Sequence, residues 1–280
     1  MKTIILIFLT LICCIQHTWG QQFSFETFSL GTFTLPYRKA EINIDNISHP
    51  SLVLYLHGGG SRGIDNEKQL SEKAVQIIFN YLSEKGTPTI FIIPQCPMEE
   101  GWTNHNHKII HELLKSCLQT HDADINRIYI MGGSMGGTGT WCQLSNYPNF
   151  YAAAMPVAGN PSGMNAEFIA STPTLTVMGT ADKLMDISIV ETLQKQVTNL
   201  GGTLLLETEK EWTHSYTCEN SYTTERLDWI FSHTRNPLNN IIPQKMSLKK
   251  STKGIYNLNG QQTNYHIRGI YIENGIKRFY

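Results

Sequence analysis

Four short, nearly continuous apolar runs recur along the chain, and they constrain its fold more than any other feature. They occupy residues 51–60, 87–97, 126–134 and 172–182, and each ends in loop-forming residues. Strands that are apolar on both faces belong to parallel sheets covered by helices. The other elements expected are helices at 66–84, 105–120, 136–147, 186–200 and 221–234 and one more strand at 202–209. This alternation predicts an α/β fold, in which a mostly parallel, doubly wound sheet carries helices on both faces.

One of these strands ends in a glycine-rich turn that holds a single serine. Residues 132–136 read Gly-Gly-Ser-Met-Gly, which fits the pattern G-x-S-x-G between a strand and a helix. The glycines let strand and helix approach closely, and the dipole of the following helix favours an oxyanion. A phosphate-binding loop is the alternative, but no lysine follows in a G-K-[ST] pattern and the G-x-G-x-x-G spacing is absent. Ser134 is therefore the predicted nucleophile.

A nucleophilic serine needs a base and an acid that orients the base, and on this kind of sheet the chain order is serine, acid, histidine. Asp182 directly follows a predicted strand and is the predicted acid, whereas Asp186 lies at the expected start of a helix and fits a cap. His214 lies in the loop after the strand 202–209 and is the predicted base. His233 lies near the end of a helix, where it would interact with the helix C-terminus.

Backbone donors for an oxyanion are predicted at two places. Met135 N–H follows the nucleophile, and the sequence His-Gly-Gly-Gly at 57–60 comes after an early strand. Gly59 N–H is the predicted second donor, with Gly60 as the alternative. We expect His57 to hold this loop by hydrogen bonds, because it precedes the glycines at the strand end.

Other side chains near the predicted strand ends could also take part in the site. Gln95 and Trp102 follow the strand within 87–97 and are predicted, on weaker grounds, to line the substrate pocket. His105, His107 and His111 could suggest zinc, but only the last two share a helical face and no fourth ligand is evident. A solvated helix face is the favoured interpretation, and neither a metal nor a cofactor is predicted.

Composition and the N-terminus set the class of protein. With 41% hydrophobic residues and a net charge of -1, the composition is that of a globular protein and gives no support for nucleic-acid binding, which needs a basic face. Residues 1–20 combine Lys2, a short apolar run and small residues near a cleavage site, which is typical of a secretory signal peptide. A retained signal anchor is the alternative. The predicted location is outside the cell, in the periplasm or on the cell surface.

Four cysteines remain after the signal peptide, at widely spaced positions. We expect buried free thiols, although export would permit disulfides and Cys96 with Cys142 is a conceivable pair. The four are Cys96, Cys117, Cys142 and Cys218.

Several segments together resemble a known family over roughly residues 25 to 235. These are "LYLHGGGSRGIDNEKQL", "INRIYIMGGSMGGTGTW" and "WTHSYTCENSYTTERLDWIFSHTR". They are similar to secreted α/β-hydrolases of the feruloyl and acetyl-xylan esterase group, which includes phospholipase/carboxylesterase-like proteins and predicted peptidases. Thr213 stands where the group usually has glycine, and Gly59–Gly60 replaces the commoner Ala-Gly pair.

The resemblance implies an α/β-hydrolase fold over 21–235 and a serine hydrolase that cleaves carboxylic esters through an acyl-enzyme. The group's members imply a small ester or an esterified polysaccharide, carrying feruloyl or acetyl groups, as substrate. A serine peptidase of the prolyl oligopeptidase type is the related alternative. A catalytically silent binding protein with this fold is the other.

The C-terminal residues have a different pattern. Residues 236–253 lose periodicity and are predicted to be a linker, whereas 254–280 alternate as short strands with Asn-Gly turns at 259–260 and 274–275. This segment resembles the sorting modules of type IX secretion, which implies contact with secretion machinery or the cell surface. A small β appendage packed on the hydrolase is the alternative.

Overall fold

The computed structural model describes residues 22–44, 49–97, 101–104 and 106–235, together with short strands between residues 255 and 279. The chain divides into two compact units, Met1–Asn236 and Pro237–Tyr280. The predicted signal peptide (1–20) and the predicted linker (236–253) lie outside the described residues.

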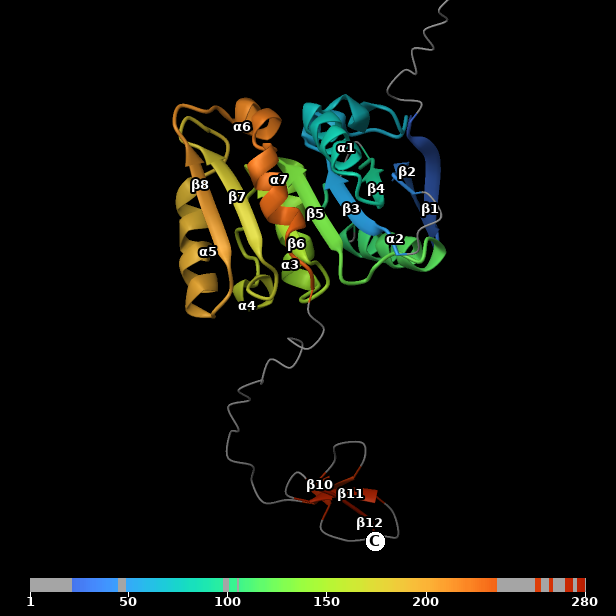
Figure 1. Ribbon diagram of the computed structural model, residues 1–280. Helices are drawn as coiled ribbons and strands as arrows, with labels where there is room; N and C mark the ends of the chain where they lie inside the picture. Colours follow the sequence, from blue (N-terminus) through green and yellow to red (C-terminus); the bar gives the residue numbers. More distant parts are fainter. Residues whose placement is uncertain are drawn as a thin grey trace, which may run out of the picture. The chain divides into compact units, whose positions relative to one another are not determined.

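The first unit is built on an eight-stranded sheet with the order β1-β2-β4-β3-β5-β6-β7-β8 (Figure 1). The strands are β1 (Ser24–Leu30), β2 (Phe33–Ile42), β3 (Ser51–Leu56), β4 (Thr89–Pro94), β5 (Ile128–Gly133), β6 (Ala153–Val157), β7 (Thr174–Gly179) and β8 (Leu204–Glu209). From β4 to β8 all neighbours are parallel, whereas β2 pairs antiparallel with both β1 and β4. The sheet is therefore mixed but mostly parallel.

Helices cover both faces of this sheet. On one face lie α1 (Lys73–Lys85) and α7 (Thr224–Phe231), and on the other lie α2 (Asn106–Thr120), α3 (Met135–Asn146) and α5 (Ile187–Asn199) (Figure 1). Leu52 and Leu54 of β3 pack into the layer under α2, α3 and α5, whereas Val53 and Tyr55 pack into the layer under α1 and α7. Every residue of β3 is buried, because both of its faces are covered, and this is why the run reads as continuously apolar.

Shorter elements connect the main ones. They are the 3-10 helices η2 (Gly59–Ser61) and η3 (Lys68–Ser71) and the helices α4 (Ala166–Ile169) and α6 (His214–Asn220). Among the described residues, no helix combines the length and apolar character needed to cross a bilayer.

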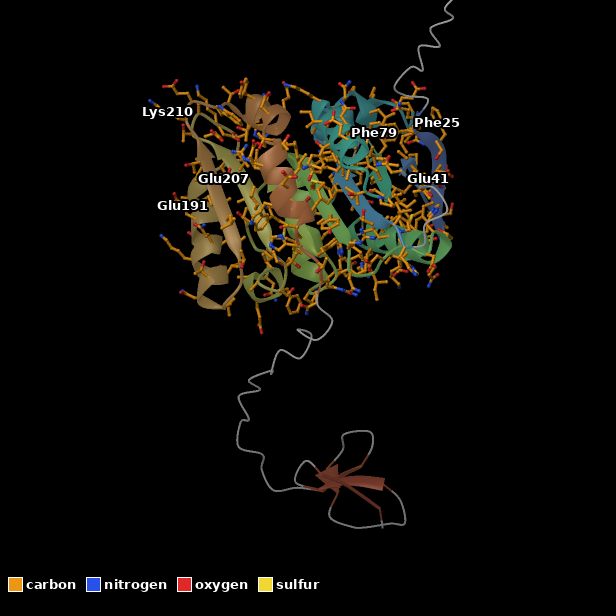
Figure 2. The ribbon with its side chains drawn as sticks, viewed as in Figure 1. Phe25, Glu41, Phe79, Glu191, Glu207 and Lys210 are labelled. Atoms are coloured by element: carbon orange, nitrogen blue, oxygen red, sulfur yellow. The ribbon has the colours of Figure 1, made fainter. Side chains whose placement is uncertain are left out.

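An arginine contacts each edge strand of the sheet, through an aromatic ring on β1 and through carboxylates on β8. Figure 2 shows Phe25 on β1 and Glu207 on β8. The Arg38 guanidinium lies 3.5 Å from the centre of the Phe25 ring. At the other edge, Arg226 of α7 binds Glu207 at 2.7 Å and also Glu209 of β8. These ion pairs fix α7, and with it the preceding α6, against the end of the sheet.

The predicted parallel sheet is confirmed, with differences at its margins. The predicted strands correspond to β3, β4, β5, β7 and β8, but the β1–β2 hairpin, β6, α4 and α6 were not predicted. The helix predicted at 66–84 begins only at Lys73, because the chain forms η3 first. The four cysteines are free thiols; Cys96, Cys117 and Cys142 are buried as expected, whereas Cys218 is only partly buried.

The second unit contains a small antiparallel sheet with the order β10-β9-β11-β12. Its strands are β9 (Ile255–Asn257), β10 (Gln262–Thr263), β11 (Ile270–Glu273) and β12 (Ile276–Phe279). Glu273 pairs with Ile276 and Tyr256 with Gln262. The strands that flank both predicted Asn-Gly turns therefore pair as hairpins, although residues 259–260 and 274–275 themselves lie outside the described residues.

Candidate active site

Ser134 lies on a sharp turn between β5 and α3. Its backbone has φ 57° and ψ −117°, which is a rare conformation for a residue other than glycine. The Ser134 N–H donates to Val157 O of β6 at 2.9 Å. A Cβ atom on Gly136 would lie 1.7 Å from Leu56 O, so glycine is required here by the close approach of α3 to β3. The turn thus has the strained strand–turn–helix geometry predicted from the sequence, with the N-terminus of α3 beside the hydroxyl.

The structure brings the three predicted reactive residues together. His214 is the first residue of α6, its Nε2 lies 2.7 Å from Ser134 Oγ, and its Nδ1 lies 2.7 Å from Asp182 Oδ2. A carboxylate can only accept, so Nδ1 carries the proton that bonds Asp182 and Nε2 accepts from the serine hydroxyl. This arrangement is able to draw the proton from Ser134 and hold the resulting imidazolium.

Asp182 is fixed by its own loop. The Asp182 side chain is completely buried, and its Oδ1 accepts from Leu184 N–H at 2.7 Å and from Met185 N–H at 3.0 Å. The second carboxylate oxygen is left for His214. The loop that follows β7 therefore orients the acid before any substrate is present.

Asp186 and His233, which were not chosen as the acid and the base, both interact with the ends of helices. Asp186 is the N-cap of α5, and its Oδ1 accepts from Ser188 N–H at 2.9 Å. His233 Nδ1 lies 2.7 Å from Trp229 O at the C-terminal end of α7. Both positions agree with the choice of Asp182 and His214.

The predicted oxyanion donors lie on either side of Ser134. Gly59 begins η2 and lines a cavity together with Ser134 and His214, and Met135 N–H is the first amide of α3. Within the described part of the chain, neither amide donates a hydrogen bond. The neighbouring Gly58 N–H is already engaged, since it donates to Glu72 Oε1 at 2.7 Å. The two free amides can therefore receive a negative oxygen bound at Ser134.

His57 holds the glycine loop, as expected. Cys96 N–H donates to His57 Nε2 at 2.9 Å, which places the ring proton on Nδ1, and Nδ1 lies 2.6 Å from Gly58 O. Burial lowers the pKa of His57 to about 4, so the ring is neutral at pH 7. A neutral imidazole thus donates to the loop on one side and accepts from the backbone on the other.

Gln95 and Trp102 do not line the cavity, contrary to the expectation from sequence. Both are buried; Trp102 bonds to the glycine loop, and Gln95 bonds to the segment that follows it. Gln95 Oε1 accepts from Asn66 N–H at 2.6 Å, and its Nε2 donates to Asp65 at 2.9 Å. Trp102 Nε1 donates to His57 O at 2.8 Å. The segment after β4 turns inward beneath the loop, so these side chains face protein instead of substrate.

The histidines of α2 pack against aromatic rings and are not a solvated face. His107 Nδ1 lies 3.0 Å from Tyr147 Oη, and the His111 ring stacks on the Tyr147 ring with centroids 3.7 Å apart. His105 lies outside the described residues. Across the ranges that are described, no group of three His, Cys, Asp or Glu side chains is placed to hold a metal ion.

The cavity beside Ser134 has a volume of about 530 Å³ and lies between the start of α1 and α6. Lys73 Nζ donates to Asn220 Oδ1 at 2.7 Å and joins the two helices that form its walls. Its lining residues are Tyr55, Gly58, Gly59, Gly60, Ser71, Glu72, Lys73, Ala74, Gly133, Ser134, His214, Ser215, Cys218 and Glu219.

Glu72 and Cys218 are cavity residues that sequence reasoning missed. Glu72 lies within the helix predicted at 66–84, so its position in the sequence gave no signal of a role at the site. Cys218 Sγ would lie 3.4 Å from a Cβ atom placed on Gly133, and burial raises the pKa of its thiol to about 12. The thiol is therefore uncharged beside the nucleophile.

Of family models, curated proteins and solved structures, only solved structures are similar to the chain. No protein-family model and no curated protein matches the chain. Among solved structures, a thermostable esterase is similar with a TM-score of 0.68 and 24% identity, over 77% of this chain and 64% of that one. The chain thus spans less than two thirds of that esterase.

Two further solved structures are also similar to this chain. A mutant of the feruloyl esterase module from Clostridium thermocellum, complexed with sinapinate, has a TM-score of 0.60 and 15% identity over 75% of this chain and 87% of that one. The acylaminoacyl peptidase of Pyrococcus horikoshii has a TM-score of 0.56 and 12% identity over 75% of this chain and 41% of that one. At such identities the likeness establishes architecture, and with the mostly parallel eight-stranded sheet it shows that the chain has the α/β-hydrolase fold.

Proposed function

We propose that the protein is a secreted serine hydrolase that cleaves carboxylic esters through an acyl-enzyme. The observation that carries the proposal is the pair of 2.7 Å contacts that link Ser134 Oγ to His214 Nε2 and His214 Nδ1 to Asp182 Oδ2. A nucleophile, a base and an orienting acid in this geometry are the requirement for acyl transfer.

The first half-reaction forms the acyl-enzyme. Ser134 Oγ attacks the ester carbonyl as its proton passes to His214 Nε2, and Asp182 stabilises the imidazolium. The carbonyl oxygen becomes an oxyanion that accepts from Gly59 N–H and Met135 N–H. The tetrahedral intermediate then breaks its bond to the alkoxy group, which takes the proton from His214 and leaves as the alcohol.

The second half-reaction returns the enzyme to its resting form. Water attacks the acyl carbon while His214 Nε2 takes a proton from it, and the same two amides hold the second oxyanion. Collapse of this intermediate breaks the bond to Ser134 Oγ, which recovers its proton from His214. The products are one alcohol and one carboxylic acid, and no cofactor takes part.

The proposed substrate is a carbohydrate ester that carries a feruloyl or acetyl group. The cavity of about 530 Å³ combines apolar walls from Tyr55 and Ala74 with polar side chains from Glu72, Lys73 and Glu219. Such a lining suits an acyl group joined to a hydroxyl-rich alcohol. The similarity to a feruloyl esterase module complexed with sinapinate supports the same substrate class.

Secretion is part of the proposal and rests on sequence. Residues 1–20 have the pattern of a signal peptide, and residues 254–280 resemble a sorting module. The proposed location is therefore outside the cell, in the periplasm or on the cell surface.

The test is an ester assay on the purified mature protein and its Ser134→Ala variant. Release of acetate and ferulate from esterified xylan fragments is measured, with a peptide amide in parallel. We expect ester cleavage by the native enzyme and a loss of at least about 10⁴-fold in kcat for Ser134→Ala. Ser145→Ala, on the same helix α3 but bonded to Asn165 N–H, is the matched control and should keep full activity.

Each other outcome of this assay points to one of the alternatives. Cleavage of the peptide amide without any ester cleavage would assign a serine peptidase. Inactivity on every substrate, with retained binding of xylan fragments, would assign a binding protein on a hydrolase fold.

A further inference from the structure

Glu72 occupies the N-cap position of α1, yet its carboxylate does not cap that helix. The residue has extended backbone angles, φ −71° and ψ 126°, and its side chain makes no hydrogen bond to the first turn of α1. An aspartate or glutamate at a helix start would ordinarily accept from those amides. The Glu72 side chain instead turns toward β3 and the glycine loop, so helix capping does not account for it.

Both oxygens of this carboxylate are bonded to the loop or to the strand before it. Oε1 accepts from Gly58 N–H at 2.7 Å and from Ser61 Oγ at 2.8 Å, and Oε2 accepts from Tyr55 Oη at 2.8 Å. Gly58 immediately precedes η2 and Ser61 is its last residue. One side chain therefore ties down both ends of the segment that contains Gly59.

The electrostatic setting of Glu72 is unfavourable for a carboxylate. The residue is half-buried, and among the described residues the groups that act on its carboxylate are neutral donors and no cation. Burial raises the pKa of Glu72, with the hydrogen bonds from Tyr55, Ser61 and Gly58 acting in the opposite direction. A carboxylate held by neutral donors and without a cation costs free energy, and such sites are more often functional than stabilising.

The carboxylate also lies close to the nucleophile. A Cβ atom placed on Gly58 would be 3.4 Å from Glu72 Oε1 and 3.8 Å from Ser134 Cβ. Gly58 therefore lies between the Glu72 carboxylate and Ser134.

We propose that Glu72 is a positioning residue, which fixes the Gly58–Ser61 loop so that Gly59 N–H is presented to the oxyanion. This inference rests on the proposed hydrolase function. Glu72 does not touch the reacting atoms, and it acts through the backbone of the loop.

The geometry of two consecutive peptide groups explains how this works. Glu72 Oε1 binds the N–H of the peptide between His57 and Gly58, and His57 Nδ1 binds the C=O of the peptide between Gly58 and Gly59. In a trans peptide the N–H points opposite to the C=O. Gly59 N–H is therefore directed away from His57, because His57 holds the C=O of the same peptide and Glu72 holds the peptide before it. Without such anchors, three consecutive glycines would leave this donor free to rotate.

The test compares Glu72→Ala with Glu72→Gln. An amide can keep every contact, because its oxygen accepts from Gly58 and Ser61 while its nitrogen donates to Tyr55 Oη. Measured quantities are kcat and KM on p-nitrophenyl acetate and the Kd of phenylboronic acid, whose tetrahedral adduct with serine occupies the oxyanion position. Glu67→Ala, which removes an exposed carboxylate before η3, is the control.

For Glu72→Ala we expect kcat to fall by about 10- to 100-fold and boronate affinity to weaken by a similar factor, with KM within about twofold. Glu72→Gln should recover most of both losses, and Glu67→Ala should match the native enzyme. A merely structural role would lower the melting temperature without weakening the boronate selectively. Ser61→Ala and Tyr55→Phe each remove one contact, and the first should cost more in kcat because it frees one end of the loop.

Two results would overturn the inference. One is a Glu72→Ala enzyme with native kcat and boronate affinity, and the other is an equal loss in Ser61→Ala, Tyr55→Phe and Glu72→Gln. If Glu72→Ala does not fold, the two single-contact variants decide. Failure of the proposed function is a separate result, since the native protein would then neither hydrolyse the ester nor bind the boronate, and the inference would fall with it.

Discussion

Asp182 and Asp186 show how position gives the same side chain different tasks. They are four residues apart, and each accepts backbone N–H bonds from the residues that follow it. Only Asp182 keeps an oxygen for His214, because its loop leaves the end of β7 beside α6. The distinction was available from sequence, since one aspartate ends a strand and the other begins a helix.

Replacing each aspartate by asparagine separates these tasks. Asp182→Asn should lower kcat by about 10⁴-fold with little change in KM, because an amide nitrogen facing His214 Nδ1 favours the wrong tautomer. Asp186→Asn should leave kcat and the melting temperature unchanged, since its amide oxygen still caps α5. Steady-state kinetics and thermal unfolding of both variants check this. Equal losses in kcat would contradict the assignment of Asp182.

Single side chains were the hardest feature to predict away from the motifs. Gln95 and Trp102 follow a strand end, but whether such residues face the cavity or the loop depends on the path of a long connection. Glu72 was missed for a related reason. Its partners are Tyr55, Gly58 and Ser61, which lie 11 to 17 residues earlier, and no local pattern signals contacts at that distance.

Among the strands and helices, those with a clear apolar pattern were predicted from the sequence. The central strands are buried on both faces and are rich in branched apolar residues, so they could be recognised in the sequence as strands of a covered parallel sheet. β6 is built from Ala-Ala-Met-Pro-Val, and alanine and proline do not favour strands; it forms because β5 and β7 pair with it on either side. β2 contains Pro36 and several charges and was not predicted, because it is an antiparallel strand near the edge.

The loop after β3 carries a pH-sensitive contribution to stability. The folded state holds the pKa of His57 at about 4, below its ordinary 6.5. Between these values the unfolded chain binds more protons than the folded one, so stability is full above pH 6.5 and falls as the pH drops toward 4. The loss attributable to His57 is about 3 kcal/mol.

A His57→Gln variant isolates this contribution. Glutamine does not titrate, so the difference in free energy of unfolding between native and variant proteins should shrink by about 3 kcal/mol from pH 7 to pH 4. Urea unfolding of both proteins at several pH values measures it. A difference that stays constant with pH would show that His57 is not buried in its neutral form.

For the whole molecule, the catalytic proposal depends on one unit only. Ser134, Asp182, His214, the glycine loop and Glu72 all belong to Met1–Asn236. The second unit has its own antiparallel sheet and its own pairing. The sequence indicated this division through the loss of periodicity after residue 235.

A chain that ends at residue 236 should therefore retain ester hydrolysis, with kcat within about twofold of the full chain. Removing Pro237–Tyr280 is expected to change where the protein is found and not what it cleaves. Kinetics of the purified short chain test the first expectation, and fractionation of cells that express each form tests the second. A loss of activity in a folded short chain would show that the C-terminal unit completes the site.

The close packing of α3 determines which parts of the candidate site can accept substitutions. Cβ atoms on Gly136 and Gly137 would lie 1.7 Å from Leu56 O and 2.4 Å from Val157 O, so the nucleophile is carried by a helix that neighbouring backbone holds in place. We therefore expect substitutions of these two glycines to destabilise the fold, whatever the substrate is. The opposite wall, with Ser71, Lys73, Ser215 and Glu219, is built from side chains that hold neither the triad nor the loop. We therefore expect that wall to tolerate substitutions that change the proposed substrate preference.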